Sequence, residues 1–128
     1  MSETVVRGGF LWYDLMTKDP QGAQEFYTKV AGWGLQPFND LGMPYTMFTR
    51  QGTLIGGSMQ LPEEAAKMGA PSHWVAYVGT PDVDKTMAQA LALGAKTYLP
   101  PQDIPTVGRF AVIADPQGAA FALHQRKA

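Results

Sequence analysis

The hydrophobic pattern of this chain predicts a strand followed by a helix, and it does so twice. The stretch "FLWYDLMTKDP" (10–20) alternates, with Leu11 and Tyr13 on one face and Trp12 and Asp14 on the other. Alternation with a period of two residues is typical of a strand that buries one face. Further along the chain, "HWVAYVGT" alternates in the same way. We therefore expect two strands of this kind, one at the start of each half.

A helix signal follows the first of these strands. Asp19 is a good N-cap, and Pro20 suits the first helical position, where its missing N–H costs nothing. Gly32 or Gly34 can supply the left-handed residue that ends a helix. Between them, apolar residues recur at helical spacing and predict a stripe that faces the core: Ala23, Phe26, Tyr27 and Val30.

The second half repeats these signals. Asp82 begins a helix, Gly94 stops it, and its apolar positions are Val83, Met87, Ala90 and Leu91. Strands follow both helices. "YTMFTRQ" and "TLIGGSMQL" are joined by a turn at Gln51-Gly52. "AKTYLPPQDIP" predicts a strand that runs into a proline-rich loop, and "GRFAVIADPQGAAFALHQ" predicts a hairpin with an Asp-Pro-Gln-Gly turn.

These elements predict an α+β fold of two tandem βαβββ modules within one domain, 1–128. Module one spans about 8–61, a connector about 62–71, and module two about 72–126. Superposing Asp19 on Asp82, an offset of 63 residues, also aligns the preceding strands in phase. Duplication explains this match, and so does the independent occurrence of two similar strand–helix units.

Composition excludes several classes of protein. Ten basic and eleven acidic residues form no block, so the basic stripe of a nucleic-acid binder is missing. No run of about 18 apolar residues is present, and the N-terminus "MSETVV" does not look like a signal peptide. Cysteine is absent, which excludes disulfides and thiolate chemistry. We expect a cytoplasmic protein that does not associate with membranes.

The chain resembles the vicinal oxygen chelate superfamily of glyoxalases, bleomycin-resistance proteins and extradiol dioxygenases. The resemblance rests on "DLMTKDPQGAQEFYTKVAGW", "GGSMQLPEE", "PSHWVAYVGTPDVD" and "ALGAKTYLPPQDIPTVGRFAVIADPQGAAFAL", and on the order of the two modules. It looks most similar to the branch related to lactoylglutathione lyase. The resemblance implies a curled mixed sheet around a central cleft, and assembly as a homodimer.

The resemblance also implies where a divalent metal would be bound, with one ligand from the first and last strand of each module. The corresponding first-strand positions here are Trp12 and Val75, and the last-strand position of module two is Ala122. In module one, "LIGGSMQ" offers nothing better than Ser58 or Gln60. Trp, Val and Ala side chains do not bind a cation. We therefore expect no metal or other cofactor.

An alternative is a metal site displaced by two residues along each strand. Side chains two residues apart on a strand lie on the same face, so the faces of the expected ligand positions also carry Asp14, His73 and His124. One carboxylate and two imidazoles would suit iron or zinc. Each displacement moves a side chain by about 6–7 Å, so the three need not converge.

The same faces carry the candidate site residues. His73, Asp14 and Tyr77 are candidate catalytic groups, with Asp14 able to orient His73 as a general base. The alternative to a catalytic role is that His73 is a histidine at the start of a strand whose ring hydrogen-bonds to the backbone near Pro71. Asp14 needs a partner such as His73, Arg109 or a ligand cation. Candidate ligand-binding residues are Trp12, Met47, Val75, Arg109, Ala122 and His124.

Trp12 can stack on a planar ligand or simply fill the cleft. Arg109 can bind a carboxylate, although pairing with a surface acid such as Asp103 is the more common role.

The hypothesis favoured by these residues is a metal-independent protein that binds a small organic molecule in an aromatic-lined cleft. It would act as a binding or resistance-type protein, or as a lyase or isomerase. The alternatives are a metal-dependent glyoxalase- or dioxygenase-like enzyme that uses the displaced ligands, and an interaction protein whose cleft has closed. Classical glyoxalase I activity is not expected.

Overall fold

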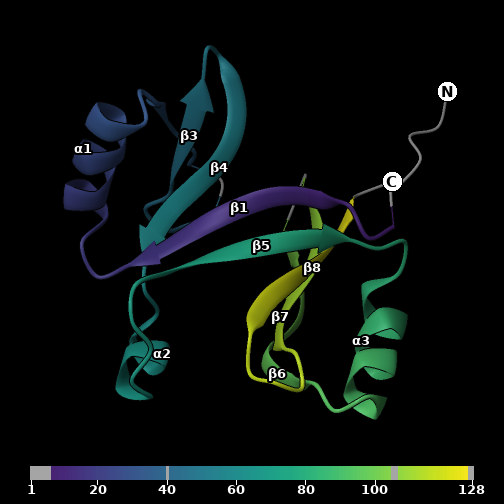
Figure 1. Cartoon of the computed structure of the whole chain (residues 1–128). Helices are drawn as coiled ribbons and strands as arrows, with labels where there is room; N and C mark the ends of the chain where they lie inside the picture. Colours follow the sequence, from purple (N-terminus) through teal and green to yellow (C-terminus); the bar gives the residue numbers. More distant parts are fainter. Residues whose placement is uncertain (1–6, 40, 105–106, 127–128) are drawn as a thin grey trace, which may run out of the picture. The chain divides into compact units, whose positions relative to one another are not determined.

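The computed structural model describes residues 7–39, 41–104 and 107–126. Its first elements are β1 (Phe10–Thr17), α1 (Pro20–Val30), β2 (Gly34–Pro37), β3 (Thr46–Arg50), β4 (Thr53–Gln60) and α2 (Glu63–Lys67). The later elements are β5 (His73–Gly79), α3 (Val83–Ala92), β6 (Lys96–Ile104), β7 (Gly108–Ala114) and β8 (Ala120–Arg126) (Figure 1). The α+β class predicted from the sequence is confirmed.

Contacts divide the chain into two compact units. One comprises residues 13–75, called the 13–75 unit; the other combines the chain before residue 13 with the chain from residue 76 onward, called the 76–126 unit. The boundaries lie inside β1 and β5, so each of these strands contributes to both units.

The strand–helix–three-strand order repeats with the same pairing. In the 13–75 unit the strands are ordered β2-β3-β4-β1, and in the 76–126 unit they are ordered β6-β7-β8-β5. In each case the first strand of the repeat pairs in parallel with the last, β1 with β4 and β5 with β8. The other pairs within each unit, β2 with β3, β3 with β4, β6 with β7 and β7 with β8, are antiparallel.

The helix start signals are confirmed in both halves. The Asp19 carboxylate accepts a hydrogen bond from the Gly22 backbone N–H at 3.0 Å. In the same way, the Asp82 carboxylate accepts one from the Lys85 backbone N–H at 3.0 Å. Each bond satisfies a backbone donor that the first turn of a helix would otherwise leave unpaired. Gly32, with φ of +73°, provides the left-handed residue after α1.

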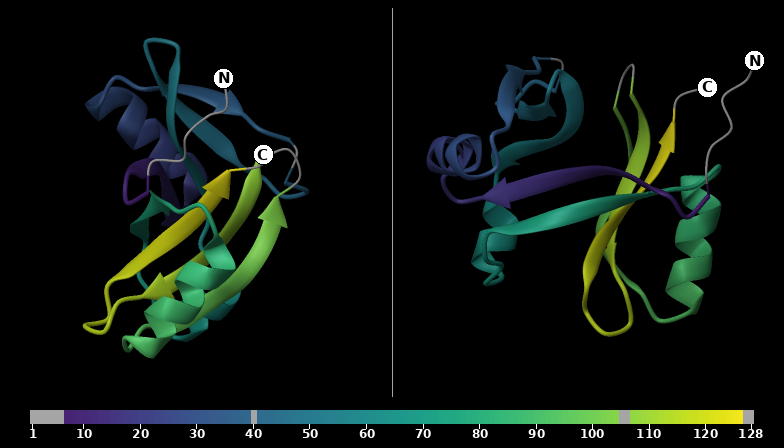
Figure 2. Two further views of the ribbon diagram at one scale, coloured as in Figure 1. Left: turned by 90° about the vertical axis from the view of Figure 1, so that its right-hand side faces the viewer. Right: turned by 45° about the horizontal axis from the view of Figure 1, so that its top comes forward.

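The two helices bury different amounts of surface. Val83 and Met87 of α3 are buried and pack in a core with residues of β7 and β8: Ala111, Ile113 and Leu123. Figure 2 shows α3 lying across β6, β7 and β8. By contrast, α1 has no buried residue, and Phe26 and Val30 are 55% and 67% exposed. The expected core-facing stripe of α1 is therefore wrong at these two positions.

The predicted proline-rich loop is also wrong, because β6 continues through Pro100 and Pro101. Its pairing with β7 shifts register twice, between Thr97 and Leu99 and between Leu99 and Gln102. A proline cannot donate to a strand ladder, so it is tolerated at an edge or irregularity. In its unit β6 is the last strand in the order.

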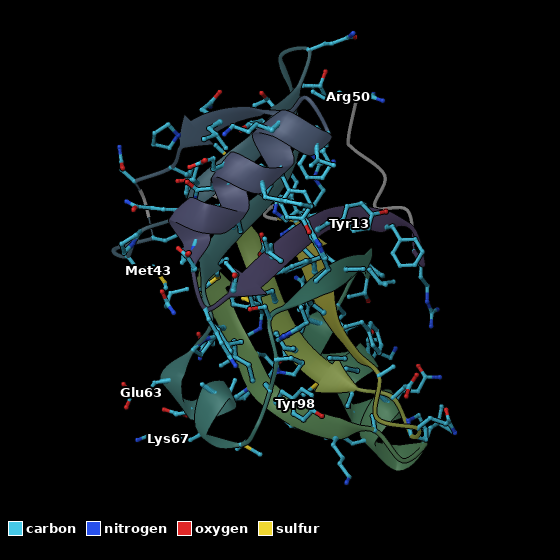
Figure 3. The ribbon with its side chains drawn as sticks, turned by 60° about the vertical axis from the view of Figure 1, so that its left-hand side comes forward. Tyr13, Met43, Arg50, Glu63, Lys67 and Tyr98 are labelled. Carbon is cyan, nitrogen blue, oxygen red and sulfur yellow. The ribbon has the colours of Figure 1, made fainter. Side chains whose placement is uncertain are left out.

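The connector between the halves contains the short helix α2. The Glu63 carboxylate and the Lys67 ammonium form an exposed ion pair at 3.1 Å, and both side chains project away from the ribbon in Figure 3. Within the described part of the chain, no helix has the length and apolar character needed to cross a membrane.

Candidate functional site

Asp14 is a buried carboxylate with a tyrosine partner. Its side chain is on β1, the residue is 5% exposed, and the hydroxyl of Tyr45 donates a hydrogen bond to Oδ1. A buried carboxylate is costly unless hydrogen-bonded, and the phenol provides such a bond. We expected His73, Arg109 or a ligand cation in this role; Tyr45 was not foreseen from the sequence.

A glycine makes room for this hydrogen bond. Gly57 of β4 lies opposite Asp14 in register, and a Cβ atom added at Gly57 would overlap the Tyr45 hydroxyl. The Tyr45 ring also contacts Phe38 edge-to-face, with centroids 6.1 Å apart. Met47 of β3 pairs with Gly57 from the other side and is buried. The phenol of Tyr45 therefore lies over Gly57 of β4, between Phe38 and the carboxylate of Asp14.

His73 has a backbone contact at the start of β5. Its Nδ1 lies 2.8 Å from the carbonyl oxygen of Pro71, so this nitrogen carries the hydrogen and donates it. This is the bond expected of a strand-entry histidine. Val75, two residues further, is 1% exposed and presents only apolar atoms.

In the 76–126 unit, Tyr77 and His124 lie in one aromatic cluster. The Tyr77 ring is 6.4 Å from the His124 ring and 6.3 Å from the Phe110 ring, measured between centroids. Tyr77 pairs in register with Ala122, which is fully buried. Burial lowers the pKa of His124 below its usual 6.5, and the nearby positive charge of Arg126 lowers it further. Trp12, in the same unit, is partly buried.

Arg109 is engaged by two surface acids. Its Nε and an Nη atom donate to the two oxygens of Asp84 at 2.8 and 3.0 Å, and its other Nη donates to Asp103 at 3.1 Å. The pairing with Asp103 was predicted; the bidentate pairing with Asp84 was not. The hydrogen bonds from Arg109 lower the pKa of Asp84 below its usual 3.8. The guanidinium is thus already occupied by carboxylates.

The 13–75 unit contains a pocket of about 350 Å³ that was not predicted from the sequence. We call it the aromatic pocket. Its lining residues come from three strands and from the segment after α1: Tyr13, Trp33, Phe48, Ile55, Gly56 and Trp74. None of these side chains is charged. Tyr13, labelled in Figure 3, is 45% exposed and Trp74 is 38% exposed, while Phe48 is fully buried beneath.

A bulge and a glycine shape the floor of the aromatic pocket. The pairing of β3 with β4 shifts between Phe48 and Thr49, so Ile55 has no residue opposite it. Such a bulge redirects side chains, here placing Ile55 in the lining. Next to it, a Cβ atom on Gly56 would lie 2.5 Å from the Tyr13 carbonyl oxygen, so only glycine allows this close approach.

The walls of the aromatic pocket are fixed by Tyr27 of α1. The Tyr27 ring stacks on Trp33, with centroids 5.4 Å apart and planes 15° apart. The hydroxyl of Tyr27 accepts a hydrogen bond of 3.1 Å from Nε1 of Trp74. The two indole planes are nearly perpendicular, at 86°, with centroids 6.1 Å apart. One side chain thus holds both indoles in place before any ligand arrives.

This arrangement differs from the site predicted from the sequence. That prediction placed the site on the face of β1 that carries Asp14, whereas Tyr13 points to the opposite face because successive side chains of a strand alternate. Trp33 and Trp74 could have been suspected as two of only three tryptophans in the chain. Periodicity alone gave them no common location.

A second pocket, of about 260 Å³, lies in the 76–126 unit at the start of α3. Its lining is polar: Arg7, Thr80, Pro81, Asp82, Lys85, Thr86 and Gln89. The hydroxyls of Thr80 and Thr86 lie 2.6 Å apart and bond each other. The Asp82 carboxylate caps the helix. The two hydroxyls thus satisfy each other, and the Asp82 carboxylate maintains the helix start.

Across the three described ranges, no group of three or more His, Asp or Glu side chains is arranged to hold a metal ion. Two positions at which the superfamily would place ligands, Val75 and Ala122, carry buried apolar side chains. The residues present therefore do not fit a divalent cation at these positions.

Comparisons with known proteins identify relatives of this chain. Residues 11–124 match the family described as a glyoxalase-like domain. CFP32 of Mycobacterium tuberculosis, which carries a provisional glyoxylase name, is 38% identical over 91% of this chain and 43% of its own length. The anthracycline biosynthesis protein DnrV of Streptomyces peucetius is 31% identical over 93% of this chain and 47% of its own. The chain thus spans less than half the length of these relatives.

A solved structure shares the fold. It is a variant of methylmalonyl-CoA epimerase from Streptomyces coelicolor in complex with 2-nitronate-propionyl-CoA. The TM-score is 0.61, with 20% sequence identity over 98% of this chain and all of the epimerase. At this level of identity the likeness concerns the fold.

Proposed function

The chain belongs to the glyoxalase-like domain family of the vicinal oxygen chelate superfamily, and on that premise we propose that it binds a small organic molecule. The proposed binding site is the aromatic pocket of the 13–75 unit, and binding there requires no metal ion. This location differs from the one expected from the sequence, whereas the kind of ligand, a small organic molecule, and the aromatic lining are those expected.

The observation that carries the proposal is a concave, aromatic surface left open to solvent. Trp74 and Tyr13 are more than a third exposed although they line a hollow of about 350 Å³. Ligand pockets commonly measure roughly 300–1,000 Å³ and are lined by apolar and aromatic side chains. Removing apolar surface from water contributes about 25 cal/mol per Å², so a ligand that covers these rings gains affinity without a polar anchor.

Relatives support a role with small molecules. The names of CFP32 and DnrV refer to glyoxylase activity and to anthracycline biosynthesis, and the epimerase was solved with a CoA derivative. All three names concern small organic compounds. Since the chain spans less than half of the two curated relatives, none of these activities is transferred to it as a whole.

The proposal is tested by blocking the aromatic pocket. A fragment set of neutral and charged organic compounds is screened by thermal shift, because a ligand that binds only the folded state raises Tm. Ile55→Phe should fill the pocket and abolish the shifts caused by pocket ligands. Leu54→Phe is the matched control, since Leu54 is 42% exposed and does not line the pocket.

The expected result is a set of fragments that stabilise the unmodified chain and Leu54→Phe but not Ile55→Phe. If every stabilising fragment binds Ile55→Phe equally well, or if no fragment stabilises the chain, the proposed function is wrong.

The buried Asp14–Tyr45 pair favours a second function, catalysis of a proton transfer of the kind a lyase or isomerase performs. Tyr45 is partly exposed while Asp14 is buried, so the phenol is the group that would meet a substrate and Asp14 would position it. His73 and Tyr77 remain the other catalytic candidates from the sequence. Solvent deuterium incorporation into a candidate keto compound, lost in Tyr45→Phe but retained in Tyr98→Phe, would support this function; equal incorporation in both variants would exclude it.

A further inference from the structure

We propose that the ligand of the aromatic pocket is a planar, uncharged aromatic molecule with about two or three fused rings. This inference rests on the proposed function, because it specifies the chemistry of a ligand at the same site. Four observations about the lining lead to it: its charge, its hydrogen bonds, the angles between its rings and its volume.

The lining contains no charged side chain. It consists of the rings of Tyr13, Trp33, Phe48 and Trp74, the aliphatic Ile55 and the bare backbone of Gly56. An anion entering the aromatic pocket would lose its hydration and meet no counter-ion there. Burial of an unpaired charge is among the most costly events in binding, so carboxylates, phosphates and sulfonates are disfavoured.

The indole of Trp74 already uses its one hydrogen-bond donor. The Nε1–H of Trp74 donates to the hydroxyl of Tyr27, so this indole cannot also donate to a ligand at full strength. The buried ring of Phe48 offers no polar atom. A ligand that lies against Trp74 and Phe48 therefore gains affinity from contact with the rings.

The ring angles suit a flat molecule. The planes of Trp33 and Trp74 differ by 86°, and Phe48 is tilted by 50° from the former and 41° from the latter. A planar ring that stacks on one indole therefore meets the other edge-on, and both arrangements are favourable for aromatic pairs. A saturated, non-planar molecule of equal size could not lie flat against either indole. A hollow of about 350 Å³ admits a fused bicyclic or tricyclic ring system.

An organic cation is the main competitor, because cations are attracted to the faces of aromatic rings. The composition of the lining opposes it. No carboxylate belongs to the lining, so the positive charge would be balanced by ring faces alone.

The test uses three compounds that share one bicyclic shape and differ in charge. They are quinoline at pH 8, where it is uncharged, the cation N-methylquinolinium and the anion naphthalene-2-sulfonate. Dissociation constants are measured by calorimetry on the whole chain, on Ile55→Phe and on Leu54→Phe. We expect quinoline to bind at least about tenfold more tightly than either ion, and this binding to be lost in Ile55→Phe and kept in Leu54→Phe. Retained Tm and near-ultraviolet circular dichroism show that each variant is folded.

Each other result overturns the inference in a recognisable way. If either ion binds as tightly as quinoline and is displaced by Ile55→Phe, the aromatic pocket is a ligand site but its ligand is charged. If quinoline does not bind while other fragments bind in an Ile55-dependent manner, the ligand class is wrong and the proposed function stands. If quinoline binds equally to Ile55→Phe, its site lies elsewhere, and the inference fails.

Discussion

The indole N–H of Trp74 donates a 3.1 Å hydrogen bond to the hydroxyl of Tyr27. This bond joins a strand residue to a helix residue 47 positions earlier in the chain. Tyr27 also stacks on Trp33, so its side chain fixes both indoles of the aromatic pocket. A wall held in this way needs little reordering when a ligand binds, which is a general source of affinity.

Replacing Tyr27 by Phe should weaken ligand binding while leaving the fold intact. The ring and its stacking on Trp33 remain, but the hydrogen bond to Trp74 is lost. A hydrogen bond contributes about 0.5–1.5 kcal/mol net, which corresponds to roughly a two- to tenfold loss of affinity. Calorimetry with quinoline measures this loss. Tyr98→Phe is the matched control, because Tyr98 is 54% exposed and lies outside the aromatic pocket; an unchanged affinity in Tyr27→Phe would show that the bond does not position Trp74.

Removing the hydroxyl of Tyr45 should destabilise the fold. Tyr45→Phe takes a hydrogen-bond donor away from the buried carboxylate of Asp14, which should cost about 1–3 kcal/mol of unfolding free energy. Gly57→Ala should have a similar effect, since the added methyl group displaces the same hydroxyl. Urea denaturation measures both changes.

Asp14→Asn serves as the comparison for these variants, because its amide oxygen still accepts from Tyr45. It should cost less than Tyr45→Phe. A change below about 0.5 kcal/mol in both Tyr45→Phe and Gly57→Ala, the range of ordinary surface substitutions, would show that the pair contributes little.

Stability should decrease as the pH falls below about 6.5, in part because of His124. Burial, and then the charge of Arg126, lower the pKa of His124 in the folded chain. The unfolded chain therefore binds a proton more readily, and the contribution to stability that is present above the unfolded pKa of 6.5 is lost as the pH falls through the folded value. The ring is half-exposed, so the effect is small.

The measurement is Tm between pH 8 and pH 5 for the unmodified chain and for His124→Gln. The variant should lose less stability over this range. An identical pH profile in both proteins would mean that His124 has the same pKa folded and unfolded.

Metal ions should not change the affinity of the aromatic pocket for its ligand. Its lining contains no carboxylate or imidazole, and Val75 and Ala122 carry no ligating atom. Dialysis against EDTA, and reloading with zinc, iron, manganese or nickel, should therefore leave the affinity for quinoline unchanged. Stoichiometric uptake of one of these ions, together with a change in quinoline affinity on reloading, would contradict this expectation.

The sequence predicted the parts of the fold that depend on local signals. Asp19 and Asp82 cap helices because their side chains reach backbone donors three residues away, and no distant contact is needed. The turn at Gln51 and Gly52 was also recognised, and both residues have positive φ, at 50° and 84°. The same local signals predicted the order of elements in the two modules, which the strand pairing repeats.

The candidate site was harder to predict, because it depends on contacts between distant segments. Tyr45 meets Asp14 across 31 residues, and only because Gly57 lacks a side chain. The aromatic pocket depends on a bulge at Ile55, which no periodicity reveals. The exposed apolar residues of α1 misled the prediction, since helical spacing does not say how much of a stripe is covered.

The most direct test of the central claim is a titration of the chain with quinoline, followed through the indole N–H signals in nuclear magnetic resonance. The chain has three tryptophans, and two of them line the aromatic pocket. The signals of Trp33 and Trp74 should shift with one common dissociation constant, while that of Trp12 stays in place. Shifts of Trp12 alone, or no saturable shift of any indole, would contradict binding in the aromatic pocket.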